Sequence, residues 1–261
     1  MNFLRLLLVF FRIGFMNEVQ YRVNFIMQLL KTALNFGWAL AAVGIVYSHT
    51  DHLNGWLPAE LVALLGVFTM MSGLIGVVIQ PSMERLIEDV REGTLDFTLT
   101  KPEEAQVLVS IGQVRVLRIV DIVAGIVIIA AALSYRDGGV EGLSGLKFAV
   151  ALAAGTAIMY SFWLVLATIS FWFVRVENIL MVFHSMYDAA RWPITIYPGW
   201  LRAALTFLVP VAFAVTVPAE ALVGRLQSDL LLATVGLAAL MLLASRQLWK
   251  VGVKRYSGAS A

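Results

Sequence analysis

Residues that could do chemistry are few in this sequence, and many of the charged ones lie in one segment, residues 81–102. The segment stands between two long apolar runs and carries more acidic than basic side chains. None of them has the partner that an acid–base or nucleophilic centre needs. Surfaces that bind anionic lipid are usually rich in Lys and Arg. A docking surface for a protein is therefore favoured, with a helix resting at the lipid headgroups as the alternative.

The first half of this segment has the pattern of an amphipathic helix. Ser82 is placed to cap its start, and Gly93 provides the left-handed residue at which a helix stops. Apolar residues recur between them at helical spacing, and charged residues fill the opposite side. The residues predicted to take part in docking are Glu84, Arg85, Leu86, Ile87, Glu88, Asp89, Val90, Arg91, Glu92 and Gly93.

The second half of the segment changes its period. Leu95, Phe97 and Leu99 alternate with polar residues, a pattern typical of extended backbone. Thr100 and Glu103 have the spacing of a capping box that would open the next helix.

Metal, redox and nucleotide chemistry have little support elsewhere in the chain. There is no cysteine, and the three histidines are not spaced as a zinc site. No G-x-x-x-x-G-K-[S/T] phosphate loop occurs, so any ATP chemistry must come from another chain. We expect no enzyme activity and no cofactor or metal in this chain.

A second group of polar residues lies within apolar runs. His184, Asp188 and Arg191 share one helical face, as a structural ion pair near the outer boundary or as the lining of a conduit. Ser72 and Gly76, with Gly66 and Gly73, form a small-residue stripe suited to close helix packing, within the chain or against another subunit.

Three further polar residues, Arg115, Arg118 and Asp121, share a face near the inner end of the third apolar run. Extension of these side chains to the membrane interface would account for them.

Composition identifies the solvent around these residues. Hydrophobic residues make up 60% of the chain and charged residues 14%, with a mean hydropathy of +0.85. We therefore predict a single-domain, all-α integral membrane protein over residues 1–261. Six spans are expected: about 23–47, 61–79, 109–133 and 145–173, one that starts near Asn178, and 230–244.

Basic residues set the predicted orientation. With the N-terminus in the cytoplasm, all but five of the 19 Lys and Arg residues lie on or toward the inner side. Both termini and the acidic segment are then cytoplasmic. The net charge of +2 reflects this asymmetry and not nucleic-acid binding.

Two further segments are predicted outside regular spans. Residues 1–20 are expected to form an interfacial helix along the inner leaflet. Residues 193–224 contain four prolines in an apolar stretch, which predicts a broken, re-entrant helical hairpin on the outer side, between spans five and six.

Three ordered motifs resemble a known family. The first is the REGTLD…L.KP series, and the second is the proline-rich series RWPITIYPGWLR…VPVAF…VPA. The third is the W…G..RY..A ending. The residues that carry them are Arg91, Glu92, Gly93, Thr94, Leu95, Asp96, Leu99, Lys101 and Pro102; Arg191, Trp192, Pro193, Tyr197, Pro198, Pro210, Phe213 and Pro218; and Trp249, Gly252, Arg255, Tyr256 and Ala259. In this order, over nearly the whole chain, they resemble the permease subunits of type-2 ABC exporters, in particular a bacterial subgroup of similar length.

This resemblance implies a half-transporter in the cytoplasmic (inner) membrane. It would pair with a second permease, identical or paralogous, and bind two ATPase subunits that hold ATP and Mg. The coupling helix would be residues 82–93, with the N-terminal helix as a second contact. The translocation path would follow spans two and five, past Ser72, Gly76, His184, Asp188 and Arg191. The alternatives are a non-ABC secondary transporter and a structural or assembly membrane protein.

Overall fold

The computed structural model describes residues 9–16, 22–135, 142–173 and 177–256. In these ranges every regular element is a helix, apart from one isolated bridge between Leu53 and Trp56. The predicted all-α class is therefore confirmed. Residues 9–16 of the expected interfacial helix are helical, and its remaining residues lie outside the described ranges.

Among the described residues, five helices are long and apolar enough to cross a membrane, which supports the predicted integral membrane protein. They are Val23–Tyr47, Pro58–Glu92, Val116–Ser134, Gly142–Ile169 and Ser228–Val253. They correspond to the first, second, third, fourth and sixth predicted spans.

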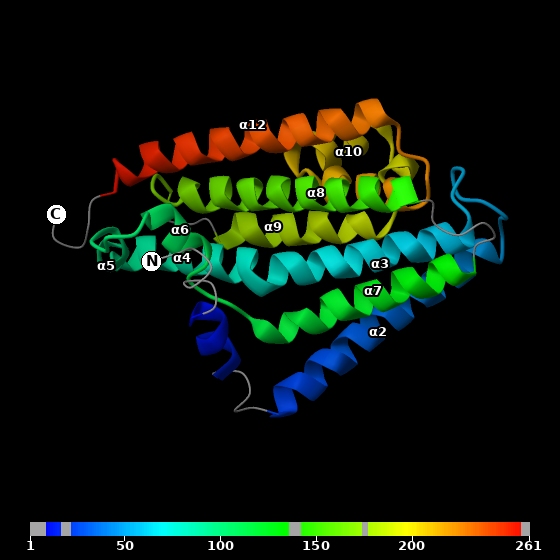
Figure 1. Ribbon diagram of the computed structural model, residues 1–261, viewed down its shortest axis with the longest axis horizontal. Coiled ribbons are helices and arrows are strands. Elements are labelled where there is room, and N and C mark those ends of the chain that lie inside the picture. The colour runs from blue at the N-terminus through cyan, green and yellow to red at the C-terminus, as the bar shows by residue number, and fades with distance from the viewer. Residues whose placement is uncertain (1–8, 17–21, 136–141, 174–176, 257–261) are drawn as a thin grey trace.

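The long helices that form these spans lie side by side in one bundle (Figure 1). In chain order the named helices are α2 (Arg22–Tyr47), α3 (Pro58–Leu74), α4 (Gln80–Glu92), α5 (Asp96–Leu99), α6 (Ala105–Ser110), α7 (Ile119–Ser134), α8 (Gly142–Ile169), α9 (Glu177–Asp188), α10 (Gly199–Ala203), α11 (Val217–Leu222) and α12 (Ser228–Val253).

Two predicted span boundaries are wrong. The second span continues through a five-residue π-helical segment, η1 (Ile75–Ile79), directly into α4, so one unbroken helix runs from Pro58 to Glu92. The third span does not begin at Val109, because the backbone after α6 is irregular until the 3₁₀ turn η2 (Val116–Arg118).

The predicted fifth span corresponds to α9, which has 12 residues. At about 1.5 Å per residue such a helix rises about 18 Å, less than the roughly 30 Å of a hydrocarbon core. The chain then tightens into a 3₁₀ turn, η3 (Ala189–Arg191), ahead of Pro193. The count of six spans stays a prediction.

The proline-rich segment is broken, as its sequence predicts. Two helical stretches, Gly199–Leu208 and Ala212–Leu222, are bent by 80° at the break that contains Pro210. Proline has no backbone N–H to donate and its ring clashes with the preceding turn, so a helix stops there. The bend makes an L-shaped pair, and its placement at the outer side stays a prediction.

The central helix of the bundle is α3. Two thirds of its membrane-length window is buried (67%), against 11% for α2 and 17% for α12. α2 runs at an angle along the edge of the bundle, whereas α12 packs on α8 at the opposite side (Figure 1).

Glycines bring α3 and α7 into backbone contact. A Cβ added at Gly125 would lie 2.5 Å from the backbone nitrogen of Met70, and one at Gly73 would lie 2.7 Å from that of Ile122. Gly66 meets Ile129 in the same way. The small-residue stripe of α3 is therefore used within the chain, which decides between the two interpretations left open by the sequence.

Candidate functional site

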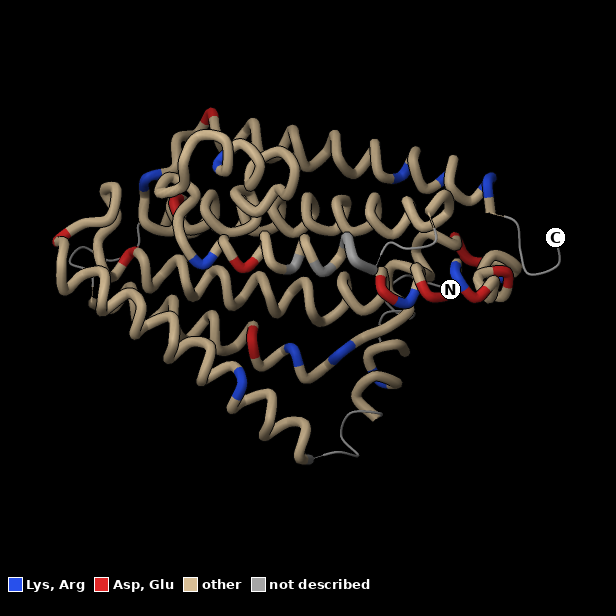
Figure 2. The backbone as a smooth tube through the Cα atoms, turned by 180° about the vertical axis from the view of Figure 1, so that it is seen from behind, with Lys and Arg blue, Asp and Glu red and all other residues tan. Residues whose placement is uncertain are grey.

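Charged residues gather at one end of the bundle, where α4 and α5 lie (Figure 2). The remaining charged residues are spread along the helices and at the opposite end. Two places in the described structure could carry function: this charged end, and a cavity among the spans.

At the charged end, α4 starts differently from the prediction. Ser82 does not cap a helix, because α4 continues from η1 without interruption. Its side chain is buried and its hydroxyl donates to the carbonyl of Gln113 at 2.9 Å while accepting from the backbone N–H of Gln113 at 3.2 Å. Ser82 thus joins α4 to the irregular segment before span three.

The apolar face of α4 is packed inside. Met83, Leu86 and Ile87 are 0%, 1% and 5% exposed, and Leu95, just past the helix, is 0% exposed. Leu86 and Ile87, which the sequence includes among docking residues, therefore anchor α4 to the bundle and are closed to a partner. The end of the helix is as predicted, with Gly93 at a φ of 73°.

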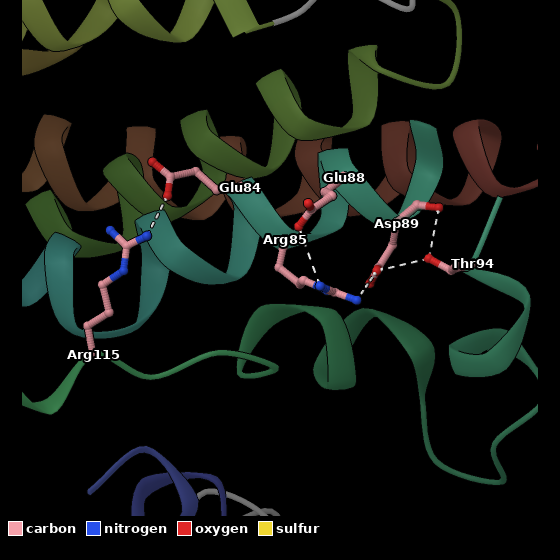
Figure 3. Close-up of polar contacts among 6 residues, drawn as sticks. All are labelled: Glu84, Arg85, Glu88, Asp89, Thr94 and Arg115. Atoms are coloured by element: carbon pink, nitrogen blue, oxygen red, sulfur yellow. Dashed lines mark hydrogen bonds and ion pairs between the residues drawn. The ribbon is translucent and has the colours of Figure 1, made fainter. Parts of the chain in front are cut away.

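The face of α4 that points away from the bundle carries an ion-pair network (Figure 3). Arg85 lies 3.4 Å from Glu88 and 2.9 Å from Asp89. Asp89 also accepts a hydrogen bond from the Thr94 hydroxyl at 3.1 Å, and its side chain is only 15% exposed. Asp89 therefore organises the turn after α4, whereas Glu88, at 44%, presents its carboxylate outward.

A second set of contacts ties α4 to the start of span three. The Arg115 guanidinium lies 3.0 Å from the Glu84 carboxylate (Figure 3), and the Arg115 backbone N–H donates to the Val77 carbonyl at 2.8 Å. Together with Ser82, these contacts hold the irregular segment against the helix that runs from Pro58 to Glu92. α4 is therefore joined by these contacts to both spans.

The period-two prediction for residues 94–100 is wrong. α5 is a short helix, closed by the N–H groups of Thr98 and Leu99 on the carbonyl of Leu95 at 2.8 and 3.0 Å. Because a helix turns residues i and i+2 to different sides, Leu95 is buried while Phe97 is 75% exposed. Sequence reasoning missed the exposed position of Phe97; its only signal is an aromatic ring inside a charged segment.

The predicted capping box is also wrong. α6 begins at Ala105, and its cap residue, Glu104, makes no capping hydrogen bond through its side chain. Its carboxylate instead lies 2.8 Å from Arg246 of α12. The Thr100 hydroxyl donates instead to the Phe97 carbonyl at 3.4 Å.

The C-terminal motif forms a packing cluster at the same end. The ring of Phe171, after α8, meets Trp249 and Tyr256 at centroid distances of 5.8 and 5.9 Å. Gly252 allows this approach, since a Cβ there would lie 2.7 Å from the Thr168 side chain. Burial raises the pKa of Tyr256 above its ordinary value, and the nearby negative charge of Asp96 adds to the rise.

The second place is a cavity of about 400 Å³ among α2, α3, α8 and α9. Three of the predicted path residues, Ser72, Asp188 and Arg191, line it. Gly76 does not; a Cβ on it would meet the Arg118 side chain at 3.2 Å. The side chain of His184 lies outside the described residues.

At one side of this cavity lies a polar cluster made of Gln28, Thr32, Arg118 and Asp121. The Asp121 carboxylate is 6% exposed and accepts from the Gln28 amide at 3.0 and 3.1 Å, from the Thr32 hydroxyl, and from Arg118 at 3.2 Å. Extension to the interface is therefore wrong for Asp121 and Arg118. Sequence reasoning also missed Gln28 and Thr32, two polar residues at i and i+4 in the first span.

Elsewhere in the cavity, Asp188 and Arg191 form the ion pair expected from their spacing, at 3.1 Å. The Arg191 guanidinium lies 5.4 Å from the centroid of Phe68, and its Nε is buried without a hydrogen-bond partner among the described residues. The negatively polarised face of the Phe68 ring attracts the Arg191 cation and so stabilises its charge. In the described ranges no group of three His, Cys, Asp or Glu side chains is placed to hold a metal ion.

The long apolar helices and the charged end define a multi-pass membrane protein. Over residues 33–260 the chain matches the profile of the family described as ABC-2 family transporter protein. The match covers most of the chain, which therefore belongs to this family as a permease component of an ABC transporter. Searches of curated proteins and of solved structures give no match. The narrower bacterial subgroup stays a prediction.

Proposed function

We propose that this chain is the membrane-spanning subunit of an ATP-driven exporter. It forms the translocation path with a second permease and is powered by two separate ATPase subunits, which bind ATP and Mg. In this proposal the chain lies in the cytoplasmic membrane with both termini inside. Membership of the ABC-2 family supports the association with an ATPase and with the membrane.

One observation carries the docking proposal: α4 is not a separate loop helix but the end of the helix Pro58–Glu92. A force applied to α4 therefore acts on α3 directly. It also acts on span three, through the contacts of Ser82 and Arg115. Because α3 and α7 are in backbone contact at their glycines, the two spans move together.

The surface offered to the ATPase is defined here as the docking face. It consists of the exposed side chains of α4 and α5: Arg85, Glu88, Arg91, Glu92 and Phe97. Charged residues around one exposed aromatic ring are a usual composition for a protein interface, in which the ring supplies most of the affinity.

In the proposed cycle, closure of the ATPase dimer pushes on the docking face. α3 and α7 then shift relative to α2, which is the least buried of the spans. The cavity between α2 and α3 changes its access as a result, in the manner of a rigid-body transition.

The test reverses two carboxylates of the docking face in the full complex. Glu88→Arg with Glu92→Arg is expected to lose at least 90% of the co-purified ATPase and of ATP-dependent transport, with insertion unchanged. Asp51→Arg, at an exposed acid away from α4, is the control and retains both activities. Full ATPase retention by the Glu88/Glu92 variant refutes the docking role.

A further inference from the structure

The cavity carries an excess of positive charge among its described lining residues. Three cations line it, Lys31, Arg118 and Arg191, against two carboxylates, Asp121 and Asp188. Two of the cations are paired, each with one carboxylate. Lys31 is an exposed residue at the edge of this lining and makes no hydrogen bond or ion pair with the described residues, so its positive charge is not paired among them.

Charged donor groups of the lining are also left without partners among the described residues. Asp121 is saturated, because each of its oxygens already accepts two hydrogen bonds from the polar cluster. Arg191 keeps a buried Nε–H without a partner in the described part of the chain, and Lys31 offers three N–H donors. A ligand that brings acceptors or negative charge would satisfy these groups. A cation would find Asp121 occupied, and Asp188 already paired through one oxygen with Arg191.

The rest of the lining is aromatic and aliphatic. Rings of Phe36, Phe68, Phe162 and Phe183 face the same cavity, together with the aliphatic side chains of Leu65, Ile75 and Val209. Such walls bury an apolar body, and a volume of about 400 Å³ lies within the range of small-molecule sites. Positive charge beside apolar walls favours a ligand with both characters.

We propose that the cavity binds an anionic amphiphile, a molecule with one carboxylate or phosphate group and an apolar body, as cargo of the transporter. The anionic group pairs with Lys31, with Arg118 and Arg191 as further donors, and the apolar body lies against the phenylalanine rings. This inference rests on the proposed transport function. The same chemistry belongs to a single-chain organic acid and to an anionic membrane lipid, which the test separates.

The test measures binding to the purified permease in nanodiscs of phosphatidylcholine, without an ATPase. The probes are cis-parinaric acid, ionised at the pH used, and its neutral methyl ester, both followed by energy transfer from tryptophan. We expect the acid to bind at least tenfold more tightly than the ester. Lys31→Gln should remove that preference, Lys31→Arg should keep it, and Lys250→Gln, at an exposed lysine of α12, is the matched control.

Two competitors separate the sources of the ligand. Displacement of the acid by laurate but not by phosphatidylglycerol assigns the site to a single-chain acid, and displacement by phosphatidylglycerol assigns it to a lipid. Equal affinity of acid and ester overturns the proposal, as does an unchanged preference in Lys31→Gln or displacement by inorganic phosphate alone. Since no ATPase is present, these outcomes are independent of the docking test.

Discussion

Replacing Asp121 by Asn leaves the shape of the side chain nearly unchanged but removes the charge on which the polar cluster converges. The Arg118 cation then loses its carboxylate, and the Gln28 amide and the Thr32 hydroxyl lose their charged acceptor. Breaking a buried ion pair costs about 3–5 kcal/mol in soluble proteins, whereas interhelical hydrogen bonds in membranes average only about 0.6 kcal/mol. Arg118 is 29% exposed to the cavity and is partly solvated there. We therefore expect a loss of about 2–3 kcal/mol in the free energy of unfolding.

The assay for Asp121→Asn is denaturant unfolding in bilayer discs, combined with a double-mutant cycle. Arg118→Gln alone should be destabilising, but the two substitutions together should cost about 1–2 kcal/mol less than their sum, because no stranded cation remains. Asp229→Asn, an exposed acid at the start of α12, is the control.

A distance measurement completes this test. The sequence contains no cysteine, so a pair can be introduced for spin labels at Met27 of α2 and Val127 of α7, both more than half exposed. In Asp121→Asn the distance distribution should broaden, since the polar cluster joins these two helices. The reasoning is refuted if the variant unfolds within 0.5 kcal/mol of the wild type (about a twofold change in the equilibrium constant) and keeps the same distribution.

Two other predictions concern packing and docking. In Gly125→Val, a Cβ would lie 2.5 Å from the backbone nitrogen of Met70, so we expect the free energy of unfolding to fall by more than about 3 kcal/mol, or the protein not to fold. A Cβ at Gly37 meets no atom within 4 Å, so Gly37→Ala should change the free energy of unfolding by less than about 1 kcal/mol in the same assay. Phe97→Ala should weaken binding of the ATPase about 30-fold, because a central aromatic contact is worth about 2 kcal/mol. The thermal midpoint of unfolding should not change. Equal ATPase affinity of the variant and the wild type, measured by titration, would contradict the place of Phe97 in the docking face.

Sequence periodicity predicted the helices that bury one face. In α4, Met83, Leu86 and Ile87 recur at helical spacing, and the structure buries all three. The stripe with Gly66 and Gly73 likewise predicted close packing, although a stripe by itself does not identify the helix that fills it. The local sequence pattern was enough to predict burial where the buried residues lie on neighbouring turns of one helix.

The sequence pattern did not predict hydrogen bonds between residues that are distant in the chain. Gln28 and Thr32 are isolated polar residues in an apolar run, and their acceptor, Asp121, follows 93 and 89 residues later. Nothing within one span shows that pairing. Phe97 was misplaced for a different reason. The helix α5 has only four residues, too few to show a helical period in the sequence, and it is formed by backbone hydrogen bonds to the Leu95 carbonyl.

The π-helical segment η1, Ile75–Ile79, lies where the membrane-buried part of the long helix becomes its charged end. Its backbone bonds reach one residue further than those of an ordinary α-helix, and such wide turns often occur at functional positions. If η1 changed to the hydrogen-bond pattern of an α-helix, the residues after Gln80 would rotate about the helix axis, and the helix from Pro58 to Glu92 would stay continuous. In the proposed transport cycle, a change of winding at η1 would therefore rotate α4 about the helix axis, in addition to any displacement along it.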